Sequence, residues 1–212
     1  MKKLLSLYRI HLRRQYGMYI IPVIFVYTIL VPYQMQYMDK VEYSTALRIY
    51  EAAQQFLMVI FVWNQFLSFR FLLTANQIEA YGHKHICHEF LWYFINTVIG
   101  LSTFLPYYIW LGIRLGEYGD GVKVLLIQNM IVSYFAYAVM NLIGSAIGGF
   151  FIVIAYLFMC IMGYIPEGIG IIELYMLPQD YGLNWYGVQI TLGILLMIFY
   201  IIRVRIKPLS YL

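Results

Sequence analysis

Long apolar runs separated by short polar connections dominate the chain. A helix needs about 20 apolar residues to cross about 30 Å of hydrocarbon, because each residue adds about 1.5 Å. The runs are continuous rather than alternating, which favours helices over the strands of a barrel. The pattern predicts an all-α integral membrane protein with six transmembrane helices, at residues 18–38, 52–73, 91–111, 124–143, 146–165 and 188–202.

The division between the fourth and fifth spans is inferred from the length of one uncharged run. The chain carries no charged residue from Val124 to Ile165. As a single helix this run would extend about 63 Å, roughly twice the hydrocarbon thickness, so it must fold back on itself as two spans. Residues 141–149 hold the only cluster of turn-forming and small residues in the run, and we expect the turn there.

Composition agrees with a membrane location. Of the 212 residues, 63% are hydrophobic and 11% are charged, and the mean hydropathy is +0.74. Soluble domains lie nearer about 45–50% apolar and about 25% charged. The 22 tyrosines suit the interfacial belts of membrane proteins. No dense basic block with interleaved aromatics is present, so we expect no nucleic-acid partner, and residues 1–212 are interpreted as a single transmembrane domain.

The N-terminal segment differs from the spans. In residues 1–16, apolar side chains fall on one arc of a helix and basic side chains on another, which predicts an amphipathic helix lying on the lipid membrane. A plain positive flank of the first span is the alternative. Pro32, near the end of that span, is expected to kink or loosen its outer turn.

A polar insert at residues 74–90 separates the second and third spans. It holds three of the chain's four histidines, and on a helix His85 lies one turn from His88 and Glu89. This spacing fits a metal ligand set, but no second ligand cluster occurs on another span. We therefore expect a protein-docking face and no metal. The fourth histidine, His11, is expected at the N-terminal surface, which leaves no Ser/His/Asp arrangement.

The basic residues predict the topology. The N-terminal flank, the polar insert with Arg70 and the C-terminal tail hold ten of the fourteen lysines and arginines. Basic residues gather on the cytoplasmic side, so both termini and the insert are predicted to be cytoplasmic. Residues 166–187 would then lie outside. Their prolines, glycines and moderate hydropathy predict a re-entrant segment before the last span, or a segment lying flat on the surface.

Energy coupling is missing from the chain itself. The glycines at residues 144–149 are not followed by the Lys-Ser/Thr of a phosphate-binding loop. No carboxylate lies well inside a span, so a proton- or sodium-coupled carrier lacks its usual residues. We therefore expect a protein that is not an enzyme and depends on a separate motor.

Amides inside the spans are the remaining polar feature. An amide left unsatisfied in lipid costs several kcal/mol, so Asn64 and Gln65, near the middle of the second span, must face protein or water. Interhelical hydrogen bonding is one explanation and a substrate path is the other. The candidate translocation path comprises Asn64, Gln65, Gln128 and Asn129.

This layout resembles the type-2 ATP-binding-cassette (ABC) exporter permeases, a family of six-span subunits. The points of likeness are the basic N-terminal helix, a short cytoplasmic coupling helix between spans two and three, the turn at 141–149 and the re-entrant outer segment at 166–187. Within the coupling segment, Glu79 and Gly82 provide local support. The resemblance covers the whole chain as an architecture.

The resemblance implies an exporter in a bacterial cell membrane. Two permease subunits, forming a homodimer or a heterodimer, would pair with two cytoplasmic ABC ATPase subunits that bind ATP and Mg²⁺, and this chain would hold no cofactor. The cargo would be hydrophobic or amphipathic, such as a peptide, toxin, drug or lipid. The ATPase would dock on Ile78, Glu79, Ala80, Tyr81, Gly82, His83, Lys84 and His85.

Two rival classes remain. A substrate-binding membrane subunit of a vitamin or metal uptake system would have similar size and span number, and it predicts a small molecule that co-purifies without nucleotide dependence. A stand-alone immunity or structural membrane protein predicts no ATPase partner. Neither class requires the strongly polar segment after the second span.

Overall fold

A computed structural model of the chain describes residues 2–38, 42–73 and 86–165, together with positions 191, 195 and 198. Side chains are described for residues 9–38, 42–71 and 92–165, and at positions 191, 195 and 198. Every element in these ranges is helical, which confirms the all-α prediction for the described part. In order they are α1 (Lys2–Phe25), η1 (Val26–Leu30), α2 (Val31–Met35), α3 (Tyr43–Leu73), α5 (Ile86–Leu115), η3 (Gly116–Tyr118), α6 (Gly121–Ile143) and α7 (Ala146–Ile161).

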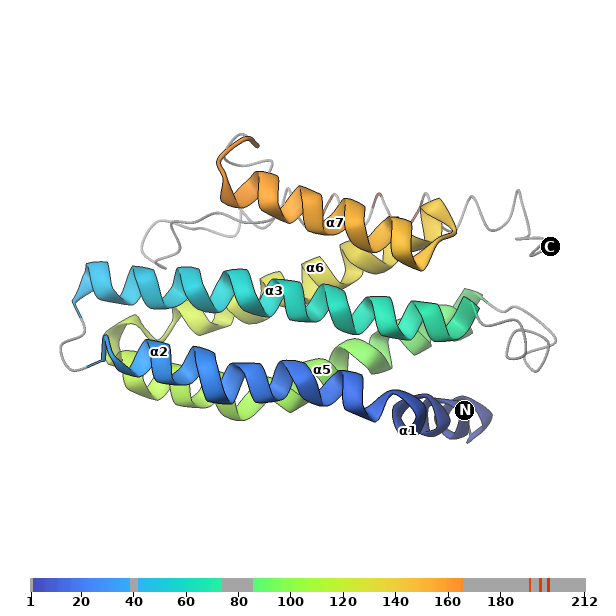
Figure 1. Cartoon of the computed structure of the whole chain (residues 1–212), viewed down its shortest axis with the longest axis horizontal. Helices are drawn as coiled ribbons and strands as arrows, with labels where there is room; N and C mark the ends of the chain where they lie inside the picture. The colour runs from blue at the N-terminus through green and yellow to red at the C-terminus, as the bar shows by residue number, and fades with distance from the viewer. Residues whose placement is uncertain are drawn as a thin grey trace.

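The helices run up and down in a bundle (Figure 1). The elements α1, η1 and α2 form one rod, α3 returns beside it, and α5, α6 and α7 alternate in direction. The start of α1, the end of α3, the start of α5 and the turn between α6 and α7 therefore lie at one end, which we call the N-terminal end. The end of α2, the start of α3 and η3 lie at the opposite end, which we call the far end.

Three segments of the described chain are helical, long and apolar enough to cross a membrane: Arg9–Met35, Trp92–Tyr118 and Gly121–Ile143. The helix Ala146–Ile161 is also apolar but is shorter. These segments support a membrane-embedded protein. The predicted last span and the re-entrant segment at 166–187 lie outside the described residues apart from single positions.

Helix α3 is as long as the candidate spans but is more polar. It packs against α1, α5, α6 and α7, so that neighbouring helices cover it on several sides. Buried along its length are Gln54, Asn64, Gln65 and Ser68 among large apolar side chains. A helix enclosed by other helices can carry amides where a lipid-facing helix cannot. Its position at the centre of the bundle therefore explains its lower hydropathy.

The uncharged run from Val124 to Ile165 turns at Gly144 and Ser145, between α6 and α7. Both residues lie inside the predicted 141–149 cluster. Gly144 has φ 72°, a left-handed conformation that glycine adopts without strain, and its N–H donates to the carbonyl of Met140. Ser145 begins α7 as its N-cap, because its Oγ accepts from the N–H of Gly148 at 3.1 Å. Helix α7 ends at Ile161, four residues before the predicted end of the fifth span.

The first rod contains a widened turn before Pro32. Val26–Leu30 is π-helical, and the N–H of Val31 bonds to the carbonyl of Val26 instead of that of Tyr27. Proline has no N–H to donate and its ring crowds the preceding turn, which favours such a local change in hydrogen bonding. The change expected near Pro32 is therefore a π-helical turn that precedes the proline, not a change in the turn that follows it.

His11 corrects one expectation. We expected it at the N-terminal surface, but its side chain is fully buried. Its Nε2 lies 2.7 Å from the hydroxyl of Tyr19, and its ring packs against Phe71 at 4.5 Å and Trp92 at 5.7 Å between centroids. Among the described side chains of the first rod, His11 belongs to a stripe of buried positions that reaches Leu30, spaced three or four residues apart or at multiples of that spacing. The N-terminal helix therefore packs one face against α3 and α5 as well as presenting arginines outward.

Candidate functional site

The predicted docking residues, Ile78 to His85, lie outside the described residues, so the docking role stays a prediction. The described helices on either side of them are informative. Leu73 ends α3 and Ile86 begins α5, and both lie at the N-terminal end of the bundle (Figure 1). The polar insert is therefore attached at the same end as α1 and the α6–α7 turn.

Basic side chains at the N-terminal end are exposed. Arg9, Arg13 and Arg14 on α1 point to solvent, and Arg70 in the last turn of α3 is also exposed. At the far end the charges are mixed instead, as in the exposed ion pair between Asp120 and Lys123. The difference between the two ends is the pattern on which the positive-inside rule depends.

A set of polar contacts joins α1, α3 and α5 near the N-terminal end. The hydroxyl of Tyr19 donates to Oδ1 of Asn96 at 3.4 Å, and the amide of Asn96 donates to the carbonyl of Asn64 at 3.3 Å. Trp92 donates to the hydroxyl of Ser68 at 2.7 Å. No sequence pattern predicts this cluster, because its members are far apart in the chain. A local signal is the spacing of His11 and Tyr19, which lie about two helical turns apart on α1.

The four candidate path residues are all buried, with at most 6% of each exposed. Gln65 donates to Thr97 on α5 at 3.0 Å, and Asn129 on α6 donates to Tyr108 on α5 at 2.7 Å. Gln128 accepts from Gln54 on α3 at 3.2 Å. Interhelical hydrogen bonds therefore satisfy part of each side chain of these three residues.

The structure does not gather the four residues into one site. Gln54, the partner of Gln128, precedes Asn64 by ten residues on α3, which is about 15 Å along the helix. The two amides of α3 contact α5 near the N-terminal end, whereas Gln128 and Asn129 lie further toward the far end. They form two separate polar contacts within this chain, and a continuous path through them stays a prediction.

Some buried polar atoms on these helices have no hydrogen-bond partner among the described residues. They include Oε1 of Gln65, Nε2 of Gln128, Oδ1 of Asn129 and Oγ of Ser133. Asn129 and Ser133 are one turn apart on α6, so the inner face of α6 holds unused polar groups. Buried polar atoms are usually satisfied by protein or by ordered water, so this face has capacity for water or a polar ligand.

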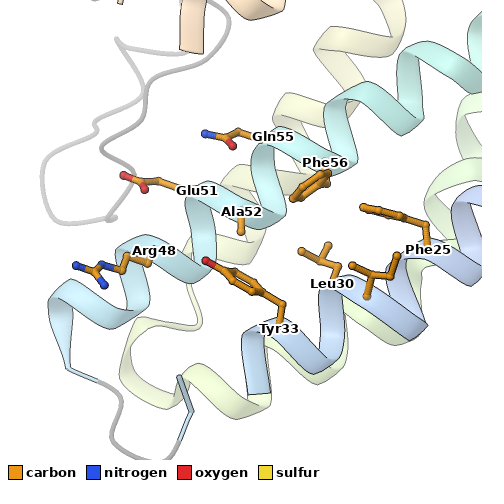
Figure 2. Close-up of a pocket in the computed structure, with 9 residues that line it drawn as sticks. Phe25, Leu30, Tyr33, Arg48, Glu51, Ala52, Gln55 and Phe56 are labelled. Atoms are coloured by element: carbon orange, nitrogen blue, oxygen red, sulfur yellow. The ribbon is translucent and has the colours of Figure 1, made fainter. Parts of the chain in front are cut away.

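A groove of about 570 Å³ lies between the first rod and α3 toward the far end (Figure 2). Its apolar lining includes Phe25, Leu30 and Phe56, and its polar lining includes Arg48, Glu51 and Gln55. None of the four candidate path residues lines it. Arg48 and Glu51 precede the predicted start of the second span at residue 52, and the structure places both in α3.

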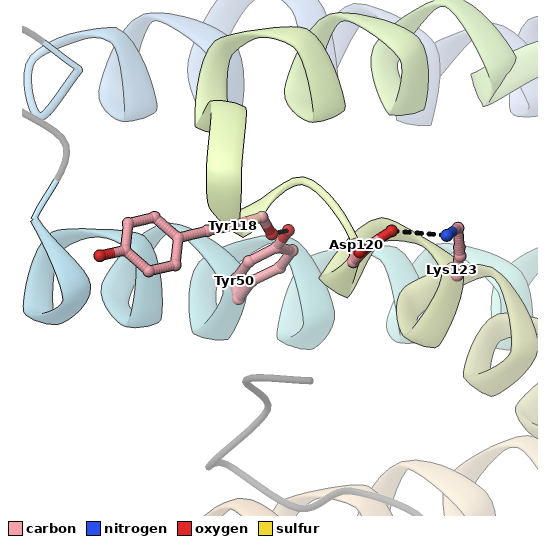
Figure 3. A network of polar contacts seen from close by, with 4 residues as sticks. All are labelled: Tyr50, Tyr118, Asp120 and Lys123. Atoms are coloured by element: carbon pink, nitrogen blue, oxygen red, sulfur yellow. Dashed lines mark hydrogen bonds and ion pairs between the residues drawn. The ribbon is translucent and has the colours of Figure 1, made fainter. Parts of the chain in front are cut away.

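Beside the groove, the far end is held by a contact between α3 and the η3 turn (Figure 3). The hydroxyl of Tyr50 donates to the carbonyl of Tyr118. Gly121 packs so close to Tyr50 that a Cβ there would lie 2.5 Å from its ring. Burial raises the pKa of Tyr50, and the nearby carboxylate of Asp120 raises it further, so the hydroxyl keeps the proton that it donates.

Among the side chains that the structure describes, no three His, Cys, Asp or Glu residues gather into a group suited to a metal ion. The side chains of His83, His85 and His88 lie outside that part of the chain. Comparison with protein-family models, curated proteins and solved structures finds no match.

Proposed function

We propose that this chain is the membrane-spanning permease subunit of an ATP-driven ABC transporter that exports a hydrophobic or amphipathic substrate. The observation that carries the proposal is the shared location of three features at the N-terminal end of the bundle. These features are the exposed arginines of α1, Arg70, and the helix ends Leu73 and Ile86 that flank the polar insert. Basic residues mark the cytoplasmic side, so the insert would face a soluble ATPase.

The proposed permease would have six spans. Three helices of the described chain have the length and hydropathy of independent membrane helices. Helix α3 has 31 residues, about 46 Å, and is long enough to cross while enclosed by its neighbours. Helix α7 and the predicted helix at 188–202 would complete the set. A second permease subunit, identical or different, would supply the other half of the path.

Helix α3 is the element suited to transmit movement of the ATPase. The polar insert follows it directly, and α3 packs against four other helices of the bundle. A displacement at Leu73 would therefore be transmitted through α3 to α1, α5, α6 and α7. ATP binding in the partner would bias the bundle between an inward-facing and an outward-facing arrangement, provided that the ATPase contacts differ between the two.

The insert is the sequence feature that distinguishes this proposal from an uptake subunit or a stand-alone protein. Its docking residues would include Glu79 and Gly82, with ATP and Mg²⁺ bound only in the partner. Cargo specificity would come from the walls between the two permease subunits.

A pull-down tests the proposal. The tagged protein would be purified from its native host in mild detergent, and the co-purifying chains would be identified by mass spectrometry. We expect a cytoplasmic ATPase with a phosphate-binding loop, and a second six-span chain would define a heterodimer. Recovery of the chain alone, or only with itself, would remove the motor and favour the immunity or structural alternative.

A further inference from the structure

The groove between the first rod and α3 has two walls of equal length. One wall runs from Phe25 to Tyr33 and the other from Arg48 to Phe56. Each wall covers eight residue steps, about 12 Å of helix. The groove is therefore an elongated slot along the bundle axis rather than a compact hole.

Polarity changes along this slot. Arg48, Glu51 and the hydroxyl of Tyr33 lie at the end nearer the start of α3, and Phe25 and Phe56 lie at the other end (Figure 2). Phe56 is a large aromatic residue that is 43% exposed, whereas its neighbours Leu57 and Met58 on the same helix are fully buried. Apart from Gln55 beside Phe56, the slot therefore matches an elongated ligand that is charged at one end and mostly apolar along its length.

The two charges at the polar end of the groove both come from α3. Arg48 and Glu51 are three residues apart on α3, yet no ion pair or hydrogen bond joins either side chain to another residue of the described chain. Asp120 and Lys123 have the same spacing on the neighbouring turn and do pair. A cation and an anion that line one groove without pairing with each other would complement a ligand that carries both signs.

The slot also lies at the depth where such ligands occur. The predicted second span begins at residue 52, so Arg48 and Glu51 fall at the membrane interface and Phe56 falls within the hydrocarbon. Headgroup charges and acyl chains of a phospholipid are separated along the membrane normal in the same sense.

We propose that this groove binds one zwitterionic phospholipid whose headgroup carries a phosphate and a primary ammonium group. Arg48 binds the phosphate, Glu51 accepts hydrogen bonds from the ammonium, and an acyl chain lies along Phe25, Leu30 and Phe56. A purely anionic headgroup would place negative charge beside Glu51. A choline headgroup has no N–H to donate to that carboxylate. The inference does not depend on the exporter proposal, because lipid binding needs neither nucleotide nor partner.

Native mass spectrometry of the full chain in mild detergent tests this site. Phosphatidylethanolamine, phosphatidylcholine and phosphatidylglycerol of identical acyl chains would be titrated separately. We expect one phosphatidylethanolamine to bind at least about tenfold more tightly than the other two, as expected for charge-assisted hydrogen bonds. Equal binding of all three lipids, or preference for phosphatidylglycerol, would overturn the proposal.

Variants locate the bound lipid. Arg48→Gln and Glu51→Gln should each weaken phosphatidylethanolamine binding about tenfold or more, whereas Lys123→Gln, which removes an exposed charge at the same end but outside the groove, should not. Phe56→Ala should weaken binding, and Phe94→Ala on α5, with a similarly exposed ring, should not. If the groove instead receives a second copy of the chain, the groove variants would change the oligomer mass and leave lipid occupancy unaltered, which would also overturn the proposal.

Discussion

Tyr107 on α5 donates its hydroxyl to Oε1 of Gln34 on α2 over 2.9 Å, at a point where both side chains are fully buried. The Nε2 of Gln34 donates to the carbonyl of Ile49 on α3 at 3.0 Å. One amide therefore links three helices at the far end of the bundle. We expect Gln34→Leu to lower the free energy of unfolding by about 1–3 kcal/mol, because it leaves the hydroxyl of Tyr107 without its acceptor.

Gln36→Leu is the matched control for that change. Gln36 is exposed two residues further along, so the same substitution there removes no buried contact. Thermal unfolding in detergent would compare the two variants with the unaltered chain. Equal midpoints for the two variants would mean that Gln34 does not link the helices as described.

The contact between α6 and α7 depends on Gly149. A Cβ at this position would lie 2.6 Å from the Cα of Met140 and 3.0 Å from its nitrogen, which are backbone atoms that cannot rotate away. We expect Gly149→Ala to push the two helices apart and to cost about 1–3 kcal/mol of stability. Gly148→Ala is the control, since its nearest neighbour is the Ser145 hydroxyl at 3.4 Å. The same unfolding measurement applies, and an unchanged Gly149 variant would contradict the close packing.

Gln54 and Gln128 provide a test that separates packing from transport. Gln128→Leu removes the acceptor used by Gln54, so we expect a loss of stability that is partly recovered in the Gln54→Leu/Gln128→Leu double variant. Direct contact should give a coupling energy of about 0.5–3 kcal/mol between the two sites. If the double variant folds and still supports export at the normal rate, Gln128 plays no part in a translocation path.

Whether a feature of this fold could be predicted depends on whether it arises from local sequence or from tertiary packing. Hydropathy and breaker residues are local properties, so the sequence alone predicted helices over the apolar runs and a turn in 141–149, which Gly144 and Ser145 form. The length and sequence of a segment determine such features without reference to the rest of the chain. An N-terminal helix was also predicted, but in the structure it is continuous with the start of the first span, as the single helix α1.

Features that depend on packing were not predictable in the same way. His11 appeared to belong to a polar surface because its neighbours are basic, but tertiary contacts with Phe71 and Trp92 bury it. The groove beside Arg48 requires the relative placement of two helices, which no local pattern encodes. Gln65 pairs with Thr97, and Gln128 pairs with Gln54. Each partner is more than thirty residues away in the sequence, so these pairs also depend on how the helices pack.

The orientation of the bundle can be tested at its two ends. In a chain with Cys87→Ser and Cys160→Ala, single cysteines would be placed at Glu117, exposed at the far end, and at Arg14, exposed at the N-terminal end. We expect a membrane-impermeant maleimide added to intact cells to label Glu117→Cys and not Arg14→Cys. Permeabilised cells provide the control, because both sites should then react. The reverse pattern in intact cells would place the polar insert outside.

The docking role of the polar insert predicts a specific separation of folding from function. Glu79→Arg and Gly82→Pro should leave the chain inserted and stable, because the insert joins α3 to α5 and the core that the structure describes is formed by residues of the helices. Both should reduce the ATPase activity of the assembled transporter to that of the isolated ATPase, since a reversed charge or a rigid kink at a docking surface disfavours binding. Glu117→Arg makes the same charge change at the far end and should leave stimulation intact. Normal stimulation in both insert variants, with the partner still bound, would exclude residues 78–85 as the coupling element, because the force would then have to enter the bundle elsewhere.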